Sequence, residues 1–220
     1  MIERNSVLLG DCLELMKDIP DKSIDILITD VPYGINENNK KNLSRSKLAN
    51  CTDFGEYLWD KTKIDRIYFN EMNRVSKNQI IFGGNYYGSI LGDTSCYIVW
   101  YKDNFENDFA DCELAWTSFK TATRFYKFRW AGMLQENMKN KEIRLHPTQK
   151  PVQLFKWILK KYTKESDLIL DPFAGSGTTA IACMELKRDY ILMEKEPKYY
   201  DIIQKRISEQ HIKQRQLELI

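Results

Sequence analysis

The stretch Asp171-Pro172-Phe173-Ala174-Gly175-Ser176-Gly177-Thr178-Thr179 decides the fold of this chain. Residues 167–170 before it form a mostly apolar stretch that is short enough to be a buried strand. Residues 180–186 after it have the composition of a helix. A strand, a glycine-rich turn and the start of a helix form the arrangement that holds nucleotide-like ligands in α/β proteins. Gly175 and Gly177 permit a tight turn and a close approach of the backbone to such a ligand.

The next strand is predicted at residues 189–193, which places Glu194 at its carboxyl end. An acid at this place can accept hydrogen bonds from the two hydroxyls of a ribose. The chain after Thr179 has room for one helix, one strand and another helix, so the other strands of the sheet must precede the turn. The alternative is a glycine-rich turn that binds nothing.

Short apolar or β-branched stretches predict these earlier strands. They lie at residues 7–9, 24–29, 79–82, 96–101 and 112–117, the last two as an antiparallel pair at the edge of the sheet. Helical spacing predicts helices at residues 13–17, 54–75 and 152–162, with Ile64, Ile67, Tyr68 and Met72 as the inner stripe of the second. Residues 35–53 are polar and unpatterned, as in a long loop that is either functional or disordered. Because parallel strands present ligands at their carboxyl ends, we expect a shared crevice for Asp11, Asp30, Asp171 and Glu194.

The composition indicates one domain that spans residues 1–220. The chain has 43% hydrophobic and 29% charged residues and a net charge of +2, so its overall charge does not identify a partner. The five cysteines are scattered and form no C-x-x-C pair, which predicts neither a metal site nor a disulfide framework. With no signal-peptide pattern and no apolar run of membrane-spanning length, we expect a cytoplasmic protein without a membrane partner.

Residues 117–144 differ from the rest of the chain because seven basic and two acidic side chains give them a local charge of +5. Aromatic residues alternate with these charges, a combination that suits a phosphate backbone and exposed bases. The candidate DNA contacts are Lys120, Arg124, Lys127 and Arg129. A solvated pair of strands with its aromatic side chains turned inward is the alternative.

The turn His146-Pro147-Thr148-Gln149-Lys150-Pro151 follows this segment. Two prolines bracket it and prepare the start of the 152–162 helix. Taken alone, the turn is a structural linker and His146 is a surface histidine.

Together these motifs resemble the DNA amino-methyltransferases of the β order, which transfer a methyl group from S-adenosylmethionine to N6 of adenine or N4 of cytosine. That family has a catalytic Asp-Pro-Pro-Tyr-type motif first, then a target-recognition region and finally a Phe-x-Gly-x-Gly cofactor motif. The order here is Asp30-Val31-Pro32-Tyr33, the basic segment 117–144, the 146–151 turn and the 171–179 stretch. The resemblance implies an α/β, Rossmann-like sheet of seven mostly parallel strands with helices on both faces, a circularly permuted motif order and a small target-recognition insertion at 117–144.

The resemblance also implies the residues of the cofactor site. The glycine turn wraps the methionine part, Glu194 holds the ribose, Asp11 and the Cys12 backbone read the adenine ring, and the 146–150 segment lies near the methionine carboxylate. The residues concerned are Asp11, Cys12, His146, Thr148, Lys150, Asp171, Phe173, Ala174, Gly175, Gly177, Thr178 and Glu194.

The catalytic residues implied by the resemblance are Asp30, Val31, Pro32 and Tyr33. The Asp30 carboxylate and the Val31 carbonyl accept the two amino hydrogens of a base that is flipped out of double-stranded DNA, and Tyr33 stacks on that base. Valine stands where the family usually has proline, but it keeps the backbone carbonyl that the mechanism uses. Because an acid at the first position goes more often with adenine, we expect N6 of adenine as the target and N4 of cytosine as the alternative.

Two other functions fit parts of the sequence. Gly175-x-Gly177-x-x-Ala180 followed by Glu194 satisfies the relaxed fingerprint of a dinucleotide oxidoreductase. A catalytically silent DNA-binding relative would keep the same fold. Because the predicted recognition segment is short, a second subunit could help to recognise the target, which would make the protein a homodimer. A restriction enzyme is a further possible partner.

Overall fold

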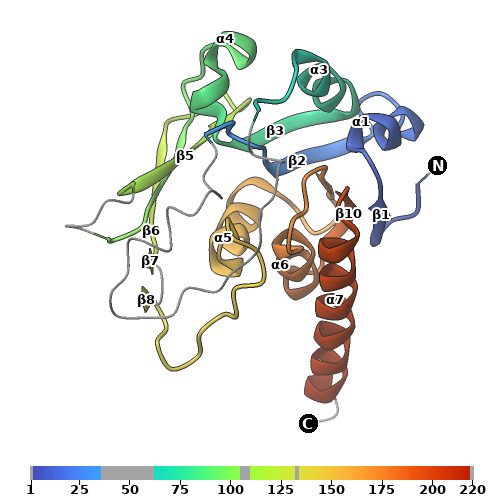
Figure 1. Cartoon of the computed structure of the whole chain (residues 1–220), viewed down its shortest axis with the longest axis vertical. Coiled ribbons are helices and arrows are strands. Elements are labelled where there is room, and N and C mark those ends of the chain that lie inside the picture. Colours follow the sequence, from blue (N-terminus) through green and yellow to red (C-terminus); the bar gives the residue numbers. More distant parts are fainter. Residues whose placement is uncertain (1, 36–61, 105–109, 132–133, 219–220) are drawn as a thin grey trace.

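The structure is a computed structural model that describes residues 2–35, 62–104, 110–131 and 134–218. Within these residues one eight-stranded sheet forms the centre of the molecule (Figure 1). Its strands, in spatial order, are β1 (Ser6–Leu9), β10 (Asp189–Glu194), β9 (Leu168–Asp171), β2 (Ile24–Asp30), β3 (Ser76–Phe82), β5 (Cys112–Thr117), β4 (Ile98–Tyr101) and β6 (Arg124–Lys127). A separate two-stranded sheet pairs β7 (Trp130–Ala131) with β8 (Leu134–Gln135).

The helices cover both faces of the large sheet. One face carries α1 (Cys12–Leu15), the 3-10 helix η1 (Met16–Asp18) and α3 (Arg66–Val75). The opposite face carries α5 (Val152–Tyr162), α6 (Thr178–Leu186) and α7 (Pro197–Glu218), so the sheet is the middle layer of three (Figure 1). The 3-10 helix η2 (Gly84–Tyr87) and the short helix α4 (Gly88–Leu91) follow β3.

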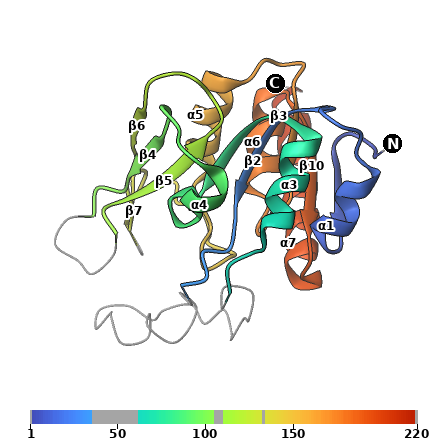
Figure 2. The same ribbon diagram turned by 90° about the horizontal axis from the view of Figure 1, so that it is seen from above.

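The strand directions confirm the predicted parallel α/β fold with one change in the strand count. All neighbouring strands are parallel except where β5 runs against β3 and β4. We expected seven strands, but Arg124–Lys127 adds an eighth by pairing with β4. The antiparallel pair β4 and β5 is confirmed, but β6 takes the edge position that we expected for this pair, at the end of the sheet opposite β1. Figure 2 shows β6 and β10 on opposite sides of the molecule.

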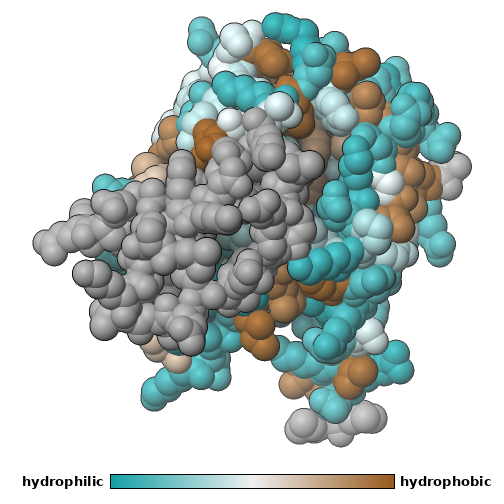
Figure 3. Space-filling view, viewed as in Figure 1, coloured by the Kyte–Doolittle hydropathy of each residue, from teal (hydrophilic) through white to brown (hydrophobic). Residues whose placement is uncertain are grey.

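Alternating side chains on the central strands supply the two halves of the core. On β2, Ile26 and Ile28 pack with the helices α5 and α6, whereas Leu27 packs with α1 and α3. These three side chains are 0–1% exposed, as strands buried on both faces require. On the face drawn in Figure 3, hydrophilic side chains predominate over the coloured surface and hydrophobic ones form small separate patches.

The predicted helix at 54–75 differs from the structure at its start and on its inner face. The structure has a helix from Arg66, where the Asp65 side chain caps it by accepting from the amide of Ile67 (2.9 Å). Residues 54–61 and most of the predicted loop 35–53 lie outside the described residues. Met72 is buried as expected, and Ile64 and Tyr68 pack against the same core. Ile67 is 49% exposed, however, and Phe69 is buried instead, so the predicted inner stripe is wrong at Ile67.

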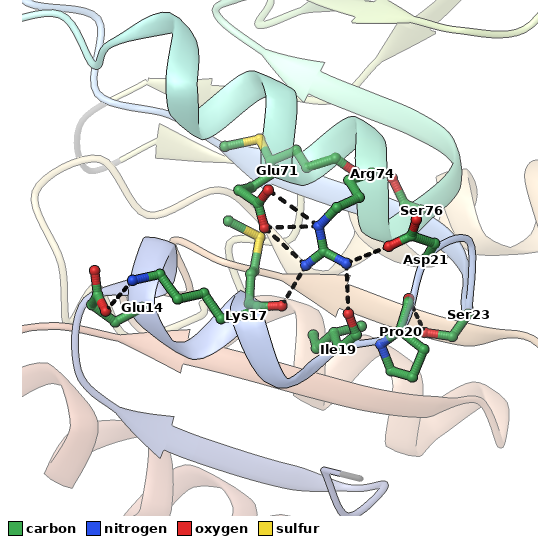
Figure 4. Close-up of polar contacts among 11 residues, drawn as sticks. Glu14, Lys17, Ile19, Pro20, Asp21, Ser23, Glu71, Arg74 and Ser76 are labelled. Carbon is green, nitrogen blue, oxygen red and sulfur yellow. Dashed lines mark hydrogen bonds and ion pairs between the residues drawn. The ribbon is translucent and has the colours of Figure 1, made fainter.

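The guanidinium group of Arg74 joins the end of α3 to the segment after α1 (Figure 4). It donates to both oxygens of Glu71, to Asp21 (2.6 Å) and to the backbone carbonyls of Met16 (2.8 Å) and Ile19 (2.9 Å). Met16 begins η1, where its carbonyl also accepts from the Ile19 amide (3.0 Å), and Ile19 follows the last residue of η1. One side chain thus satisfies backbone groups and anchors two helical segments to each other.

We predict that Arg74→Met lowers the free energy of unfolding by about 1–3 kcal/mol, because two carbonyls and two carboxylates lose their donor. Chemical denaturation measures the change. The matched control is Lys17→Met, which removes an exposed pair with Glu14 at 2.5 Å and should cost less than about 1 kcal/mol. Equal losses in both variants would contradict an anchoring role for Arg74.

Candidate active site

The glycine turn between β9 and α6 is held against the end of β10. The amide of Ala174 donates to the carbonyl of Met193 (3.0 Å), and the amide of Gly175 donates to Oε2 of Glu194 (2.8 Å). Gly175 and Gly177 have φ values of 55° and 76°, in the left-handed region that favours glycine. The predicted strand, turn and helix start are therefore present.

A half-buried arginine that the sequence analysis did not single out also holds this turn. Arg206 on α7 donates to the carbonyl of Ser176 (2.6 Å) and to its hydroxyl (3.2 Å). Nothing in the sequence near Arg206 indicates this contact, because Arg206 lies thirty residues after Ser176 in the chain.

Glu194 lies at the carboxyl end of β10, as predicted, and is 9% exposed. Besides Gly175, the amide of Glu196 donates to its Oε1 (2.9 Å). Burial raises the pKa of the Glu194 carboxyl to about 7, and the nearby Asp171 adds to the shift. This acid is therefore poised to change its charge near neutral pH.

Asp171 is the buried acid at the end of β9. Its Oδ1 accepts from the Thr29 hydroxyl (2.8 Å) and from the Phe173 amide (3.2 Å), and its Oδ2 accepts from Thr179. Burial raises the pKa of its carboxyl to about 6. The structure thus places Asp171 as a link between β2, β9 and α6, beneath the turn that was predicted to bind the cofactor.

Asp11 lies at the end of β1, beside the end of β10, because the amide of Gly10 donates to the Glu194 carbonyl (2.9 Å). Its carboxylate caps α1 through the Leu13 amide (3.0 Å) and pairs with Lys195 (3.0 Å). The Tyr68 hydroxyl lies 3.4 Å from both of its oxygens. The side chain of Cys12 is buried, which leaves only its backbone for the predicted role.

The 146–150 segment lies along the glycine turn. His146 is 8% exposed, its ring meets Tyr199 edge to face at 4.3 Å, and a Cβ added at Gly175 would lie 3.8 Å from it. Burial lowers the pKa of His146 to about 3, helped by the charges of Lys150 and Lys198, so the ring is neutral at pH 7. Thr178 donates to the backbone carbonyl of Lys150 (3.1 Å), which joins the segment to the start of α6.

The Asp30 to Tyr33 motif follows β2 directly. The Tyr33 hydroxyl donates to Oδ1 of Asp30 (2.7 Å), and the Tyr33 ring stacks on Tyr86 at 5.0 Å. Val31 is 2% exposed and packs in the core on the α1 and α3 face. The Pro32 carbonyl accepts from the Tyr87 hydroxyl (2.5 Å), which fixes the turn.

Glu113 and Lys102, which the sequence analysis did not predict, also belong to this site. Lys150, predicted near the cofactor, forms an ion pair with Oδ2 of Asp30 and lies 3.2 Å from Oε2 of Glu113 on β5. Lys102 pairs with the other oxygen of Glu113. Nothing in the sequence near Glu113 or Lys102 indicates this role, because Glu113 reaches Lys150 from another part of the chain and Lys102 meets Glu113 only through the pairing of β4 with β5.

Gly83, which follows β3, is a further residue of the site that the sequence analysis missed. Its φ is 71°, and an added Cβ would lie 2.0 Å from Cε1 of Tyr33. The Tyr33 ring therefore lies directly against this backbone. A glycine at the end of a strand next to β2 was visible in the sequence, but its contact with Tyr33 was not.

The predicted DNA contacts lie on and beside the edge strand β6. Lys120 and Arg124 are exposed, whereas Lys127 and Arg129 form ion pairs with Asp103 at 3.1 Å and 2.5 Å. The aromatic side chains divide between the two interpretations: Phe125 is 62% exposed, but Tyr126 stacks on Trp157 of α5 at 4.9 Å.

The part of the chain that the structure describes has no cluster of three or more side chains suited to a metal ion. Within the same ranges, no helix combines the length and apolarity that crossing a membrane requires.

Comparison with known proteins identifies the family. The family model for DNA methylases of the N6 and N4 class matches residues 60–205. The chain belongs to this DNA methylase family. The family predicted from the motif order is thereby confirmed, and the oxidoreductase alternative is wrong.

Two curated relatives are type II methyltransferases. M.HinfI of Haemophilus influenzae is 27% identical over 247 aligned residues, which cover 93% of this chain and 68% of that protein. M2.MboI of Moraxella bovis is 27% identical over 239 residues, which cover 91% of this chain and 86% of that protein.

Solved structures share the fold of this DNA methylase. The M1.HpyAVI–SAM complex is 23% identical, with a TM-score of 0.57 over 91% of this chain and 98% of that chain. The cytosine-N4-specific PvuII DNA methyltransferase is 17% identical, with a TM-score of 0.60 over 92% of this chain and 86% of that chain.

We predict that Gly83→Ala moves the Tyr33 ring away from Asp30 and lowers the free energy of unfolding by about 1–3 kcal/mol, because the Cβ collides with the ring and the φ value is strained. Denaturation and the near-ultraviolet circular dichroism of tyrosine measure the two effects. The control is Gly88→Ala, at a helical position with open space around the new Cβ, which should change the stability little. An unchanged tyrosine signal in Gly83→Ala would contradict the prediction.

Proposed function

We propose that this DNA methylase transfers a methyl group from S-adenosylmethionine to the exocyclic amino group of a DNA base, N6 of adenine in first place. The observation that carries the proposal is the position of Asp30 beside the glycine turn. Thr29, the residue before Asp30, donates to Asp171, the acid that begins the turn. An acceptor for the amino group and a binding turn for the methyl donor therefore lie at adjacent strand ends, where sheets of this type bind ligands.

The residues at these strand ends fit S-adenosylmethionine. Glu194 accepts one backbone hydrogen bond on each oxygen, and a carboxylate has lone pairs left for two ribose hydroxyls. Asp11 lies beside it, and the rings of Phe173 and Tyr68, 6.2 Å apart, offer flat surfaces near this acid. When bound, this cofactor supplies a methyl group on a positively charged sulfur.

Asp30 and Val31 then act on the target base. The amino nitrogen of adenine or cytosine is a poor nucleophile, because its lone pair is delocalised into the ring. The Asp30 carboxylate and the Val31 carbonyl accept its two hydrogens, which favours a pyramidal nitrogen with the lone pair directed at the methyl group. The base must leave the duplex to reach these acceptors, and Tyr33 supplies a ring on which it stacks.

The choice of adenine rests on the first residue of the motif. Asp30 is an acid, and within the resembling family an acid here goes more often with adenine. The same pair of acceptors serves cytosine, and the fold is shared with the cytosine-N4-specific PvuII enzyme. N4 of cytosine is therefore the second candidate.

We further propose that residues 117–144 recognise the target sequence and contact double-stranded DNA. The exposed Lys120 and Arg124 and the exposed ring of Phe125 support this role. Because M.HinfI and M2.MboI are type II methyltransferases, the chain is proposed to act in a type II restriction–modification system.

We predict that S-adenosylmethionine binds more tightly as the pH rises through about 7. Burial raises the pKa of Glu194 to about 7, so below this pH the carboxyl is protonated in the free protein and must lose its proton to bind as an anion. The affinity should fall by up to about tenfold per pH unit on the acidic side.

Calorimetry at several pH values measures this dependence. Glu194→Gln should bind weakly with little pH dependence, and Glu196→Gln, two residues further on, should behave as the wild type. A Glu194→Gln variant that keeps the wild-type pH dependence would remove this acid from the cofactor site.

We predict that Asp30→Ala abolishes methyl transfer and leaves cofactor binding nearly intact, because Asp30 contacts the base and not the cofactor. Asp30→Asn keeps one acceptor oxygen and should retain a trace of activity. Mass spectrometry of nucleosides from methylated DNA identifies the product. Recovery of N4-methylcytosine alone would overturn the adenine assignment, and full activity of Asp30→Ala would overturn the catalytic one.

A further inference from the structure

Both oxygens of the Asp30 carboxylate already have partners in the structure. Oδ1 accepts from Tyr33 (2.7 Å), and Oδ2 is paired with the ammonium group of Lys150. The Lys150 side chain is 5% exposed and that of Asp30 21%, so water contributes little to either charge. The proposed function, on which this inference rests, requires one of these oxygens to accept a hydrogen from the target base.

Glu113 is a second carboxylate with which the Lys150 ammonium group can form an ion pair. Its Oε2 lies 3.2 Å from Nζ of Lys150, and its side chain is 22% exposed. The lysine thus lies between two carboxylates on neighbouring parts of the sheet, one at the end of β2 and one on β5. A small movement toward Glu113 would free Oδ2 of Asp30 without leaving the lysine charge unpaired.

We propose that Lys150 and Glu113 are positioning residues for Asp30. Lys150 keeps the buried carboxylate anionic while the site is empty of base, and Glu113 receives the ammonium group when the target amine takes its place on Asp30. The carboxylate is then an anionic acceptor before and during base binding.

The electrostatics of the cluster support this arrangement. Burial raises the pKa of Asp30, Glu113 raises it further, and Lys150 opposes both. Burial alone would raise the pKa of Glu113 as well, but Lys150 and Lys102 overcome it and lower that pKa to about 2. Glu113 is thus a permanent anion, as a receiver of the lysine must be, and the pKa of Lys150 is raised by the two carboxylates despite its burial.

Other charged and titratable groups face this cluster. Tyr33, whose pKa is raised by burial and by both acids, stays protonated and donates to Asp30. Asp171 on β9 interacts with Asp30, and Arg144 interacts with Glu113. Of these three side chains, Tyr33 also contacts both acids, with its hydroxyl 2.7 Å from Oδ1 of Asp30 and 3.5 Å from Oε2 of Glu113, but it brings no positive charge to them as Lys150 does.

The first test compares pH profiles of methyl transfer in variants of opposite charge. Lys150→Met removes the cation, so the acidic limb of kcat/KM should move up by about 1–3 pH units, with activity recovered at high pH. Glu113→Gln removes an anion near Asp30, so the limb should move down by about one unit. Its plateau rate should fall on the order of tenfold, because the lysine has lost its receiver.

Two control variants accompany this test. Lys150→Arg retains the cation and should keep the limb at its wild-type position. Lys156→Met breaks a comparable lysine pair with Glu185 (2.6 Å) on the far side of α5 and should leave the profile unchanged. A limb that stays at the wild-type position in Lys150→Met and in Glu113→Gln overturns the proposal. If Lys150→Met fails to fold, the position of the acidic limb in Glu113→Gln tests the proposal, with Lys150→Arg as the control.

The second test does not depend on activity. Carbon-13 spectra of protein labelled in its aspartate carboxyls follow the protonation of Asp30, assigned by Asp30→Asn. The Asp30 titration should move up in Lys150→Met and down in Glu113→Gln. A wild-type protein that methylates no DNA would refute the proposed function, whereas unmoved Asp30 titrations would refute the role of Lys150 and Glu113.

Discussion

Strands β2 and β9 pair through Ile26 with Ile169 and Leu27 with Leu170, and toward their carboxyl ends the buried Asp171 carboxylate joins them. This carboxylate accepts from a threonine on β2 and another on α6, so three elements meet at one buried acid. The order of the strands reverses at this place, since β10 and β1 lie on one side and β3 on the other. A site built here has the glycine turn and the Asp30 to Tyr33 motif as its two walls.

The same site concentrates buried charge, which is costly unless each charge has a partner. Asp30, Glu113, Lys150 and Lys102 alternate in sign along a chain of contacts, so the group as a whole carries no net charge. Removing any one member would leave the group with a net charge in a poorly solvated place. The burial that makes this cluster costly also strengthens its interactions, which makes Asp30 a stronger acceptor for an amino group than a solvated carboxylate.

Local sequence signals predicted much of the fold and of the cofactor side of the site. The glycine turn, the strand before it and Glu194 follow from neighbouring residues, because their contacts span few positions in the chain. The position of Lys150 does not, since its ammonium group pairs with an acid 120 residues earlier, on another strand. A lysine in a proline-bracketed turn indicates no particular partner, so resemblance assigned it to the cofactor.

The basic segment 117–144 shows a second limit of local signals. Counted along the sequence, residues 117–144 carry a charge of +5, but Asp103 lies outside this range and pairs with both Lys127 and Arg129. A DNA phosphate that approached these two side chains would compete with Asp103 for their donors. Their contribution to affinity would be smaller than their formal charge suggests, since fewer counterions are released when a cation is already paired. Charge alone therefore favours Lys120 and Arg124 as the stronger phosphate contacts, whereas Arg129, held beside Asp103, is better placed to orient the segment.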